Sequence, residues 1–130
     1  MATWRELSLD NLESAKALAG EGRVRSSVSR SYYAAYCALT EALISRGVRF
    51  ARGWNNPARE QLAALISHNL PHSQNTRRRL AKLARLLRSA REDADYRPGI
   101  SIDRPLMLNC IRDAIAVLQD LGVIESGPAD

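Results

Sequence analysis

Apolar side chains recur every three or four residues along most of this chain, which is the spacing of one face of an α-helix. The pattern is clearest over about 24–45, where the inward positions are Val24, Val28, Tyr32, Ala35, Leu39 and Leu43. Four other segments show the same period less completely. The pattern predicts about five helices, over about 3–19, 24–45, 58–69, 71 or 73 to 96, and 103–121.

Turn-forming residues separate these segments. Glycine, the usual residue just past a helix end, follows the first, second and last predicted helices at Gly20, Gly47 and Gly122. The stretch 48–57 contains glycine, two asparagines and proline, so we expect a loop there. Asp103 or Ser101 is the expected N-cap of the last helix.

The composition agrees with a single all-α domain. A chain of 130 residues can bury one core, and 45% hydrophobic residues with 5% aromatics favour Ala- and Leu-rich helices over strands. We therefore expect an all-α, up-and-down helical bundle over 1–130. Its packed core should cover about 4–122, followed by a flexible tail over 123–130.

Cysteine usage and the first residues predict a cytoplasmic protein. Cys37 and Cys110 fall in apolar helical patterns without metal-type spacing, so we expect buried free thiols of a reducing compartment. The N-terminal residues carry acids where a signal peptide has a basic leader, and no apolar run approaches about 20 residues. We expect no membrane association.

Positive charge is concentrated in one predicted helix. Residues 77–97 hold eight basic and three acidic side chains, and the rest of the chain is neutral. The helical period places several cations away from the leucine seam, where they can contact RNA phosphates: Arg77, Arg78, Lys82, Arg85, Arg88 and Arg91. The alternative is a solvated face whose arginines pair with acids of the first helix, Glu6, Asp10 and Glu13.

The segment Arg30-Ser31-Tyr32-Tyr33-Ala34-Ala35-Tyr36 places three phenols and a guanidinium within two helical turns. Such side chains need polar partners when they are buried. Asp95, near the end of the basic helix, is a candidate acceptor for Arg30. We expect Arg30, Tyr32, Tyr33, Tyr36 and Asp95 to form a polar clamp or to line a cleft between the two helices.

The familiar catalytic and cofactor motifs are missing, and we expect no metal and no cofactor. His68 and His72 have metal-type spacing, but Pro71 between them interrupts the helix, so we interpret them as ordinary histidines at a helix end. Trp54 in the 48–57 loop either pins that loop to the bundle or stacks on a base of single-stranded RNA.

The two local motifs together resemble the HEPN family. Ser-Arg-Ser-Tyr-Tyr-Ala-Ala-Tyr over 29–36 and Arg-x-x-Ala-Asp-Tyr over 91–96 are similar to the R-x-Y-Y-A and R-x-x-A-D-Y motifs of a bacterial HEPN group, and the likeness spans about 5–120. The resemblance implies a helical bundle and a homodimer. It also implies either ribonuclease activity or a role beside a nucleotidyltransferase in toxin–antitoxin and defence systems.

One departure from the family pattern bears on catalysis. Catalytic HEPN ribonucleases have a histidine after four to six residues that follow the motif arginine, whereas Tyr96 stands after four residues that follow Arg91, and no histidine comes later in the chain. Arg59 stands where related sequences have another histidine. A phenol with a pKa of about 10 is a poor proton acceptor at neutral pH.

We therefore expect a HEPN module that dimerises and binds RNA, a nucleotide or a partner nucleotidyltransferase, without strong catalysis of its own. One alternative is a metal-independent endoribonuclease toxin that uses Arg91 and Tyr96. Another is a purely structural protein-interaction domain.

Overall fold

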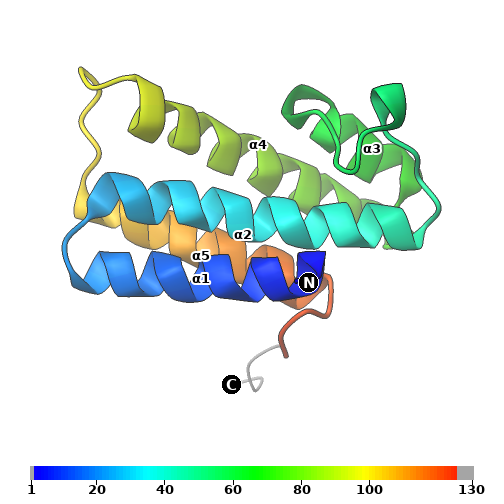
Figure 1. Ribbon diagram of the computed structural model, residues 1–130, viewed down its shortest axis with the longest axis horizontal. Helices are drawn as coiled ribbons and strands as arrows, with labels where there is room; N and C mark the ends of the chain where they lie inside the picture. The colour runs from blue at the N-terminus through cyan, green and yellow to red at the C-terminus, as the bar shows by residue number, and fades with distance from the viewer. Residues whose placement is uncertain (1, 126–130) are drawn as a thin grey trace.

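Residues 2–125, the part of the chain that the computed structural model describes, form five α-helices and two short 3₁₀ turns, without a strand (Figure 1). The 3₁₀ turns cover Ala51–Gly53 and Arg59–Gln61. The helices are α1 (Trp4–Gly20), α2 (Val24–Ser45), α3 (Leu62–Asn69), α4 (Gln74–Tyr96) and α5 (Arg104–Asp120). The all-α prediction is confirmed.

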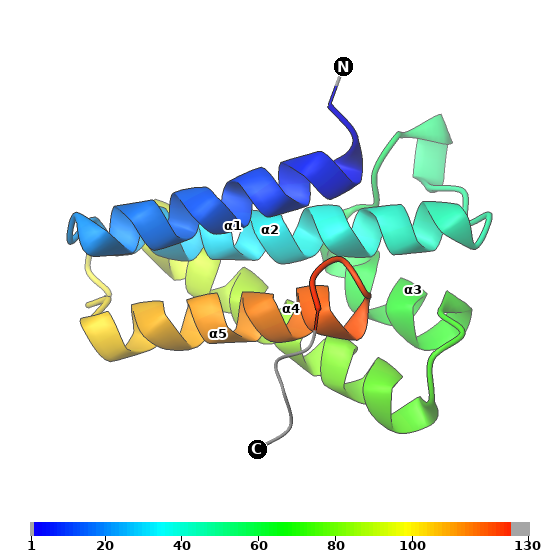
Figure 2. The same cartoon turned by 90° about the horizontal axis from the view of Figure 1, so that it is seen from below.

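The four long helices run alternately up and down, and α3 is a short helix at one end of the bundle (Figure 1). Helix α2 lies in the middle and packs against α1, α4 and α5, while α4 also packs against α3 and α5. Figure 2 shows α1 and α2 as one side of the bundle and α4 and α5 as the other. The predicted up-and-down bundle is therefore confirmed.

Helix α2 can occupy the centre because its buried face is built from small residues as well as large ones. The side chains of Ala34 and Ala35 are at most 1% exposed, so α1 and α2 approach closely. Two buried serines join these helices: Ser8 Oγ donates to the Ala34 carbonyl at 2.8 Å, and Ser27 Oγ donates to the Ala15 carbonyl at 2.7 Å. The hydroxyls of these two buried serines are thereby satisfied.

Side-chain caps set the start of three helices. Thr3, Ser73 and Asp103 accept hydrogen bonds from backbone N–H groups in the first turns of α1, α4 and α5. Asp103 is one of the two caps that the sequence predicted. Gly47 follows α2 with φ of 76°, a left-handed conformation that glycine adopts without strain.

Helix α3 begins at Leu62 instead of the predicted residue 58 because Arg59–Gln61 wind into a 3₁₀ turn. We call residues 57–61, which precede α3, the lead-in to α3. The Tyr36 hydroxyl donates to the Pro57 carbonyl at 2.6 Å and so ties this lead-in to α2. The lead-in is thereby held beside the centre of α2, where the candidate site lies.

Packing continues past residue 122, where the core was expected to end. Val123 is buried, and its carbonyl accepts a hydrogen bond from Arg5 Nη2 at 2.9 Å. The rest of the expected tail, residues 126–130, lies outside the described residues. None of the described helices is long and apolar enough to cross a membrane.

Both cysteines are buried and free, as the sequence predicted. Burial raises the pKa of the Cys37 thiol to about 11. Burial, helped by the nearby charge of Asp113, raises the pKa of the Cys110 thiol to about 11 as well. Both thiols are therefore protonated near neutral pH.

Candidate functional site

Arg91 forms the centre of a cluster between α2 and α4. Its side chain is buried, with 8% of the residue exposed, and its Nε lies 2.9 Å from Asp95 Oδ2, one helical turn further along α4. Arg91 Nη2 donates to the hydroxyl of Tyr33 at 2.9 Å and to the hydroxyl of Tyr96 at 3.0 Å. A buried guanidinium is tolerated here because one carboxylate and two phenols surround it.

Aromatic rings complete the environment of this cation. The Arg91 Cζ atom lies 5.0 Å from the ring centre of Tyr96, 5.4 Å from that of Tyr33 and 6.0 Å from that of Tyr32. These distances lie within the range of cation–π attraction. The guanidinium is therefore fixed by stacking as well as by its polar contacts.

A second arginine shares the Tyr33 hydroxyl. Arg59 Nη2 donates to this oxygen at 3.1 Å, and the Arg59 Cζ atom lies 5.6 Å from the Tyr33 ring centre and 5.9 Å from that of Tyr36. One phenol oxygen thus accepts from two guanidinium groups, one from α4 and one from the lead-in to α3. Tyr33 joins both segments to α2.

The other two tyrosines of α2 are buried. Burial raises the pKa of Tyr36, whose hydroxyl donates to the Pro57 carbonyl. Burial also raises the pKa of Tyr32, an effect that the charge of Arg59 partly offsets. The Tyr32 hydroxyl has no hydrogen-bond partner among the described residues. Both phenols stay neutral near physiological pH.

Arg25 holds the end of α4, where Asp95 and Tyr96 are located. Its guanidinium donates to five backbone carbonyls: those of Asp93, Ala94, Arg97, Pro98 and Ile100. The last carbonyls of a helix have no partner within the helix, and the negative end of its dipole favours a cation. A side chain from α2 therefore caps α4 and fixes its last turn beside the cluster.

The predicted ion pair between Arg30 and Asp95 is wrong. Arg30 is exposed and its Nη1 donates to Asn11 Oδ1 on α1 at 3.2 Å. Asp95 instead contacts Arg91, and it accepts a hydrogen bond from Ser29 Oγ at 3.1 Å. The cause is helix geometry, because Arg30 lies about 100° around the axis from Ser29. A clamp between α2 and α4 exists, but Tyr33 and Ser29 provide its α2 side.

The basic helix divides into bound and exposed cations. Arg77 Nη1 donates to the carbonyls of Leu70 and His72, so Arg77 caps the turn after α3. Arg88 pairs with Glu92 at 3.0 Å, while Arg78, Lys82 and Arg85 are exposed. Arg91 was predicted on the outer face, and this is wrong because it faces the tyrosines of α2.

The acidic partners of this helix also differ from the predicted alternative. The ion pairs link Arg79 to Asp120 of α5, and link Arg88, Arg91 and Arg97 to acids of α4 itself. The acids of α1 are not among these partners, because α4 packs against α2, α3 and α5. The pairing with Glu6, Asp10 and Glu13 that the sequence allowed is therefore wrong.

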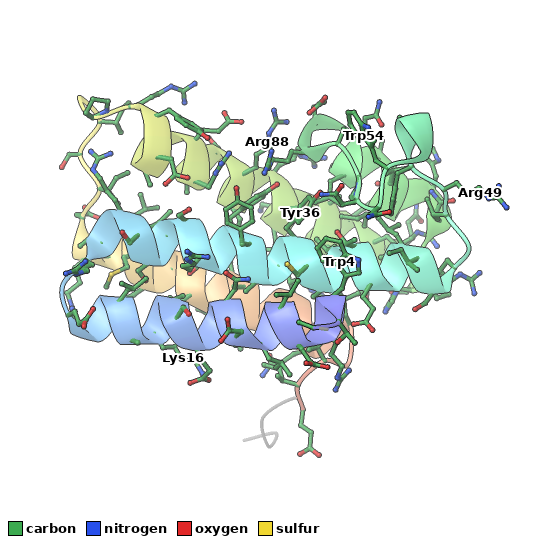
Figure 3. All side chains as sticks on the ribbon, viewed as in Figure 1. Trp4, Lys16, Tyr36, Arg49, Trp54 and Arg88 are labelled. Atoms are coloured by element: carbon green, nitrogen blue, oxygen red, sulfur yellow. The ribbon has the colours of Figure 1, made fainter. Side chains whose placement is uncertain are left out.

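Trp54 lies on the connection between α2 and α3 (Figure 3). It is 47% exposed and lines a groove of about 840 Å³ together with Trp4 and Phe50. No residue of α4 is among those that line this groove.

Three residues of the site, Arg25, Ser29 and Arg59, were not among the predicted site residues. Arg25 and Ser29 precede Tyr33 by eight and four residues, so one face of α2 presents all three toward α4. This spacing was a usable signal for Arg25 and Ser29. For Arg59 the signal was the family resemblance, which places a histidine at this position, but its contact with Tyr33 depends on the path of the lead-in to α3.

The cluster combines charged groups, phenol hydroxyls and aromatic rings. Its charged members are two guanidinium groups and one carboxylate, and its other polar atoms are phenol hydroxyls. Neither histidine is among the residues that contact Arg91 within residues 2–125. Over the same range no group of three metal-ligating side chains is assembled. Guanidinium groups and aromatic rings are suited to phosphates and bases.

The bundle and its arginine–tyrosine cluster define a small helical domain with a fixed cation on its longest helix. The chain belongs to the HEPN domain family, whose model matches residues 1–124. Comparison with curated proteins and with solved structures finds no significant match for this chain.

Proposed function

We propose that this HEPN domain binds single-stranded RNA through the outer face of α4 and does not cleave it efficiently. The observation that carries the proposal is a stripe of exposed side chains, Arg78, Lys82, Arg85 and Tyr96, which follow one another at helical spacing. We call these four residues the α4 stripe.

The α4 stripe combines the two groups that single-strand binders use. Steps of four and three residues place Arg78, Lys82 and Arg85 on one side of the helix. Tyr96 follows Arg85 after about three full helical turns, so it falls on the same side. Tyr96 is 67% exposed, so its ring is available for stacking on a base. Cations along the helix can follow the phosphates of the same strand.

The same geometry argues against efficient cleavage. Attack by the RNA 2′-hydroxyl requires a group that accepts a proton near neutral pH, and imidazole is the usual choice. Around Arg91 the groups in reach are the hydroxyls of Tyr33 and Tyr96 and the carboxylate of Asp95, which already pairs with Arg91. The cluster therefore supports binding better than proton transfer.

Fluorescence anisotropy with a labelled, 5′-hydroxyl single-stranded RNA tests the proposal. We expect the affinity to fall as salt rises, and each removed stripe cation to reduce the slope of log affinity against log salt by about 0.7. The double variant Lys82→Gln/Arg78→Gln should bind more weakly with unchanged thermal stability. A matched double variant on other surfaces, Lys16→Gln/Arg112→Gln, should retain binding.

RNA binding that is absent at low salt, or equal loss in the stripe and control variants, would refute the proposal. In the first case the structural protein-interaction domain becomes the better explanation. In the second case the net charge of the protein, and not the α4 stripe, governs the binding.

A second candidate function is a metal-independent endoribonuclease, favoured by the 3.0 Å contact between Arg91 Nη2 and the Tyr96 hydroxyl. Incubation of the protein with total RNA in the presence of EDTA distinguishes the two functions. Intact RNA at high protein concentration supports the binding module. Cleavage that Arg91→Lys and Tyr96→Phe both abolish would establish the enzyme instead.

Assembly belongs to the same proposal. Membership of the HEPN family favours a homodimer and a nucleotidyltransferase partner in a toxin–antitoxin or defence setting. Light scattering after gel filtration tests the dimer, and co-purification with a nucleotidyltransferase encoded by a neighbouring gene tests the partner. A monomer at high concentration would contradict the homodimer. Separate elution of the two proteins would contradict the nucleotidyltransferase partner.

A further inference from the structure

A small cavity of about 90 Å³ lies where α2, the lead-in to α3 and α4 meet. The side chain of Tyr32 lines it on the α2 side. Three arginines and one acid contribute to its wall, namely Arg59, Arg85, Arg88 and Glu60. Three cations against one anion give the wall an excess of positive charge, so an anion is the favoured occupant.

Tyr32, which lines this cavity, carries a polar group without a partner. The residue is 1% exposed, and its hydroxyl has no hydrogen-bond partner among the described residues. A buried hydroxyl without a hydrogen bond is unfavourable, because it has lost its bonds to water. Burial also raises the pKa of Tyr32, so the hydroxyl keeps its proton and remains a donor.

The three arginines also have donors to spare. Arg59 uses Nη2 on Tyr33, and Arg88 uses Nε on Glu92, which leaves other N–H groups of both guanidinium groups. Arg85 has no hydrogen bond or ion pair to any residue of the described chain. Several donors around one small space are the arrangement that a tetrahedral oxyanion requires.

We propose that this cavity binds the terminal phosphate of an RNA strand, an inference that rests on the proposed RNA binding by the α4 stripe. At about 90 Å³ the cavity is much smaller than the groove of about 840 Å³ beside Trp54, and it is suited to a small group such as one phosphate. An internal phosphate carries a sugar on both sides, whereas a terminal phosphomonoester can enter with its free end first.

The position of Arg85 connects the cavity to the α4 stripe. Arg85 belongs to the stripe and also lines the cavity, so a strand bound along Arg78, Lys82 and Arg85 can place its end at the cavity. The cavity thus gives the RNA-binding surface a preference for one chemical form of RNA end.

The test compares three forms of one short RNA that carry a 5′-phosphate, a 3′-phosphate or hydroxyls at both ends. We expect one of the phosphorylated forms to bind about tenfold more tightly than the hydroxyl form. Tyr32→Phe deletes the unpaired hydroxyl alone and should reduce this preference without lowering thermal stability. Arg59→Gln should also reduce it, and the matched control Arg112→Gln on α5 should preserve it.

Competition with AMP and with inorganic phosphate identifies the source of the phosphate. Displacement of the phosphorylated RNA end by AMP, lost in Tyr32→Phe, supports the cavity and assigns it to a mononucleotide as well as to RNA. Failure of both competitors, with the end preference intact, supports the RNA end alone.

Two results separate this inference from the proposed function. If all three RNAs bind equally and the α4 stripe variants weaken them, the RNA surface is correct and the phosphate cavity is wrong. If phosphate or AMP binds in a Tyr32-dependent manner while the hydroxyl RNA does not bind at all, the cavity is correct and the stripe is wrong. A preference for phosphate that Tyr32→Phe and Arg59→Gln both preserve would also overturn the cavity.

Discussion

The two halves of α4 hold arginines in different settings. In the C-terminal half, Arg91 is 8% exposed and contacts Asp95, Tyr33 and Tyr96. From the N-terminal half to the middle of the helix, Arg78 and Arg85 are exposed and have no ion-pair partner among the described residues, although Arg77 and Arg79 beside Arg78 are bonded to other segments. The buried cation holds the fold together, and the exposed, unpaired cations are available to a ligand.

The difference arises from what each half of the helix faces. The C-terminal half lies against the tyrosines of α2 and ends under the guanidinium of Arg25. Exposed cations gain little from ion pairs in water and are screened by salt, whereas a buried cation must be fully paired. Substitutions in the two halves should therefore separate stability from binding.

The largest effect is expected from Arg91→Ala. The substitution leaves the Asp95 carboxylate without its cation and the Tyr33 hydroxyl without its α4 donor. We expect a loss of about 2–4 kcal/mol in the free energy of unfolding, measured by urea denaturation. The matched control Arg78→Ala on the same helix should change this free energy by less than about 0.5 kcal/mol. Equal losses would contradict the division of α4 into two halves.

The next largest effect is expected from Arg25→Gln. Two carbonyls in the last turn of α4 and three in the segment that follows it lose their common donor, and bonds to charged groups are worth about 1.5–3 kcal/mol. We expect a loss of about 2 kcal/mol and faster hydrogen exchange over the last turn of α4. Exchange near Arg78 should stay unchanged.

Arg23→Gln is the control for Arg25, because Arg23 is two residues earlier and its side chain is 70% exposed. It should leave exchange in α4 unaltered. Uniformly faster exchange along α4 in the Arg25 variant would show that the cap supports the whole helix, and not the C-terminal half alone.

The sequence was sufficient for the fold because each helix carries its own local signals. The 24–45 period gave α2 the bounds that the structure has, Val24–Ser45, and Asp103 was a correct cap for α5. The start of α3 was missed by four residues, since Arg59–Gln61 can wind as 3₁₀ or α and a contact with α2 decides between them. Boundaries set by tertiary contacts are not encoded locally.

The site was harder to predict because it depends on which faces of two distant helices meet. The motif residues Tyr33, Arg91 and Asp95 do come together, but the sequence assigned Arg30 as the partner of Asp95. One step along a helix turns a side chain by about 100°. Charge complementarity alone could not choose between Arg30, Arg25 and Arg91 without the packing angle of α2 and α4.

A smaller effect concerns alkaline pH and the buried tyrosines of α2, which face the C-terminal half of α4. Burial raises the pKa of Tyr32 and of Tyr36 in the folded state. Below about pH 10 the folded and the unfolded chain both keep the protons of these two hydroxyls. Above this pH the unfolded chain loses the protons first. Stability should therefore be complete below this pH and fall above it, by up to about 1.4 kcal/mol per pH unit for Tyr32.

Urea denaturation of Tyr32→Phe and wild type across this range tests the alkaline effect, because the buried thiols contribute equally to both proteins. The variant should lose stability less steeply above about pH 10 and match the wild type at neutral pH. Parallel curves would show that Tyr32 does not hold its proton more tightly in the folded state.

The smallest effect on stability is expected from Tyr96→Phe, and it is the most informative about function. The Tyr96 hydroxyl accepts one hydrogen bond from Arg91, but the residue is 67% exposed, so water can replace the phenol oxygen. We expect a loss of about 0.5 kcal/mol or less in the free energy of unfolding. The ring remains, so stacking on a base and the affinity for RNA should be preserved.

Tyr96→Ala, which removes the ring as well, should weaken RNA binding about fivefold to a hundredfold, the value of one stacked base. The pair of variants thus separates the ring from the hydroxyl at one position. If Tyr96→Phe abolishes a cleavage activity that the wild type shows in EDTA, the hydroxyl takes part in chemistry, and the C-terminal half of α4 is catalytic as well as structural. If the ring alone matters, Tyr96 belongs with the exposed cations as a binding residue, although its hydroxyl contacts the buried half.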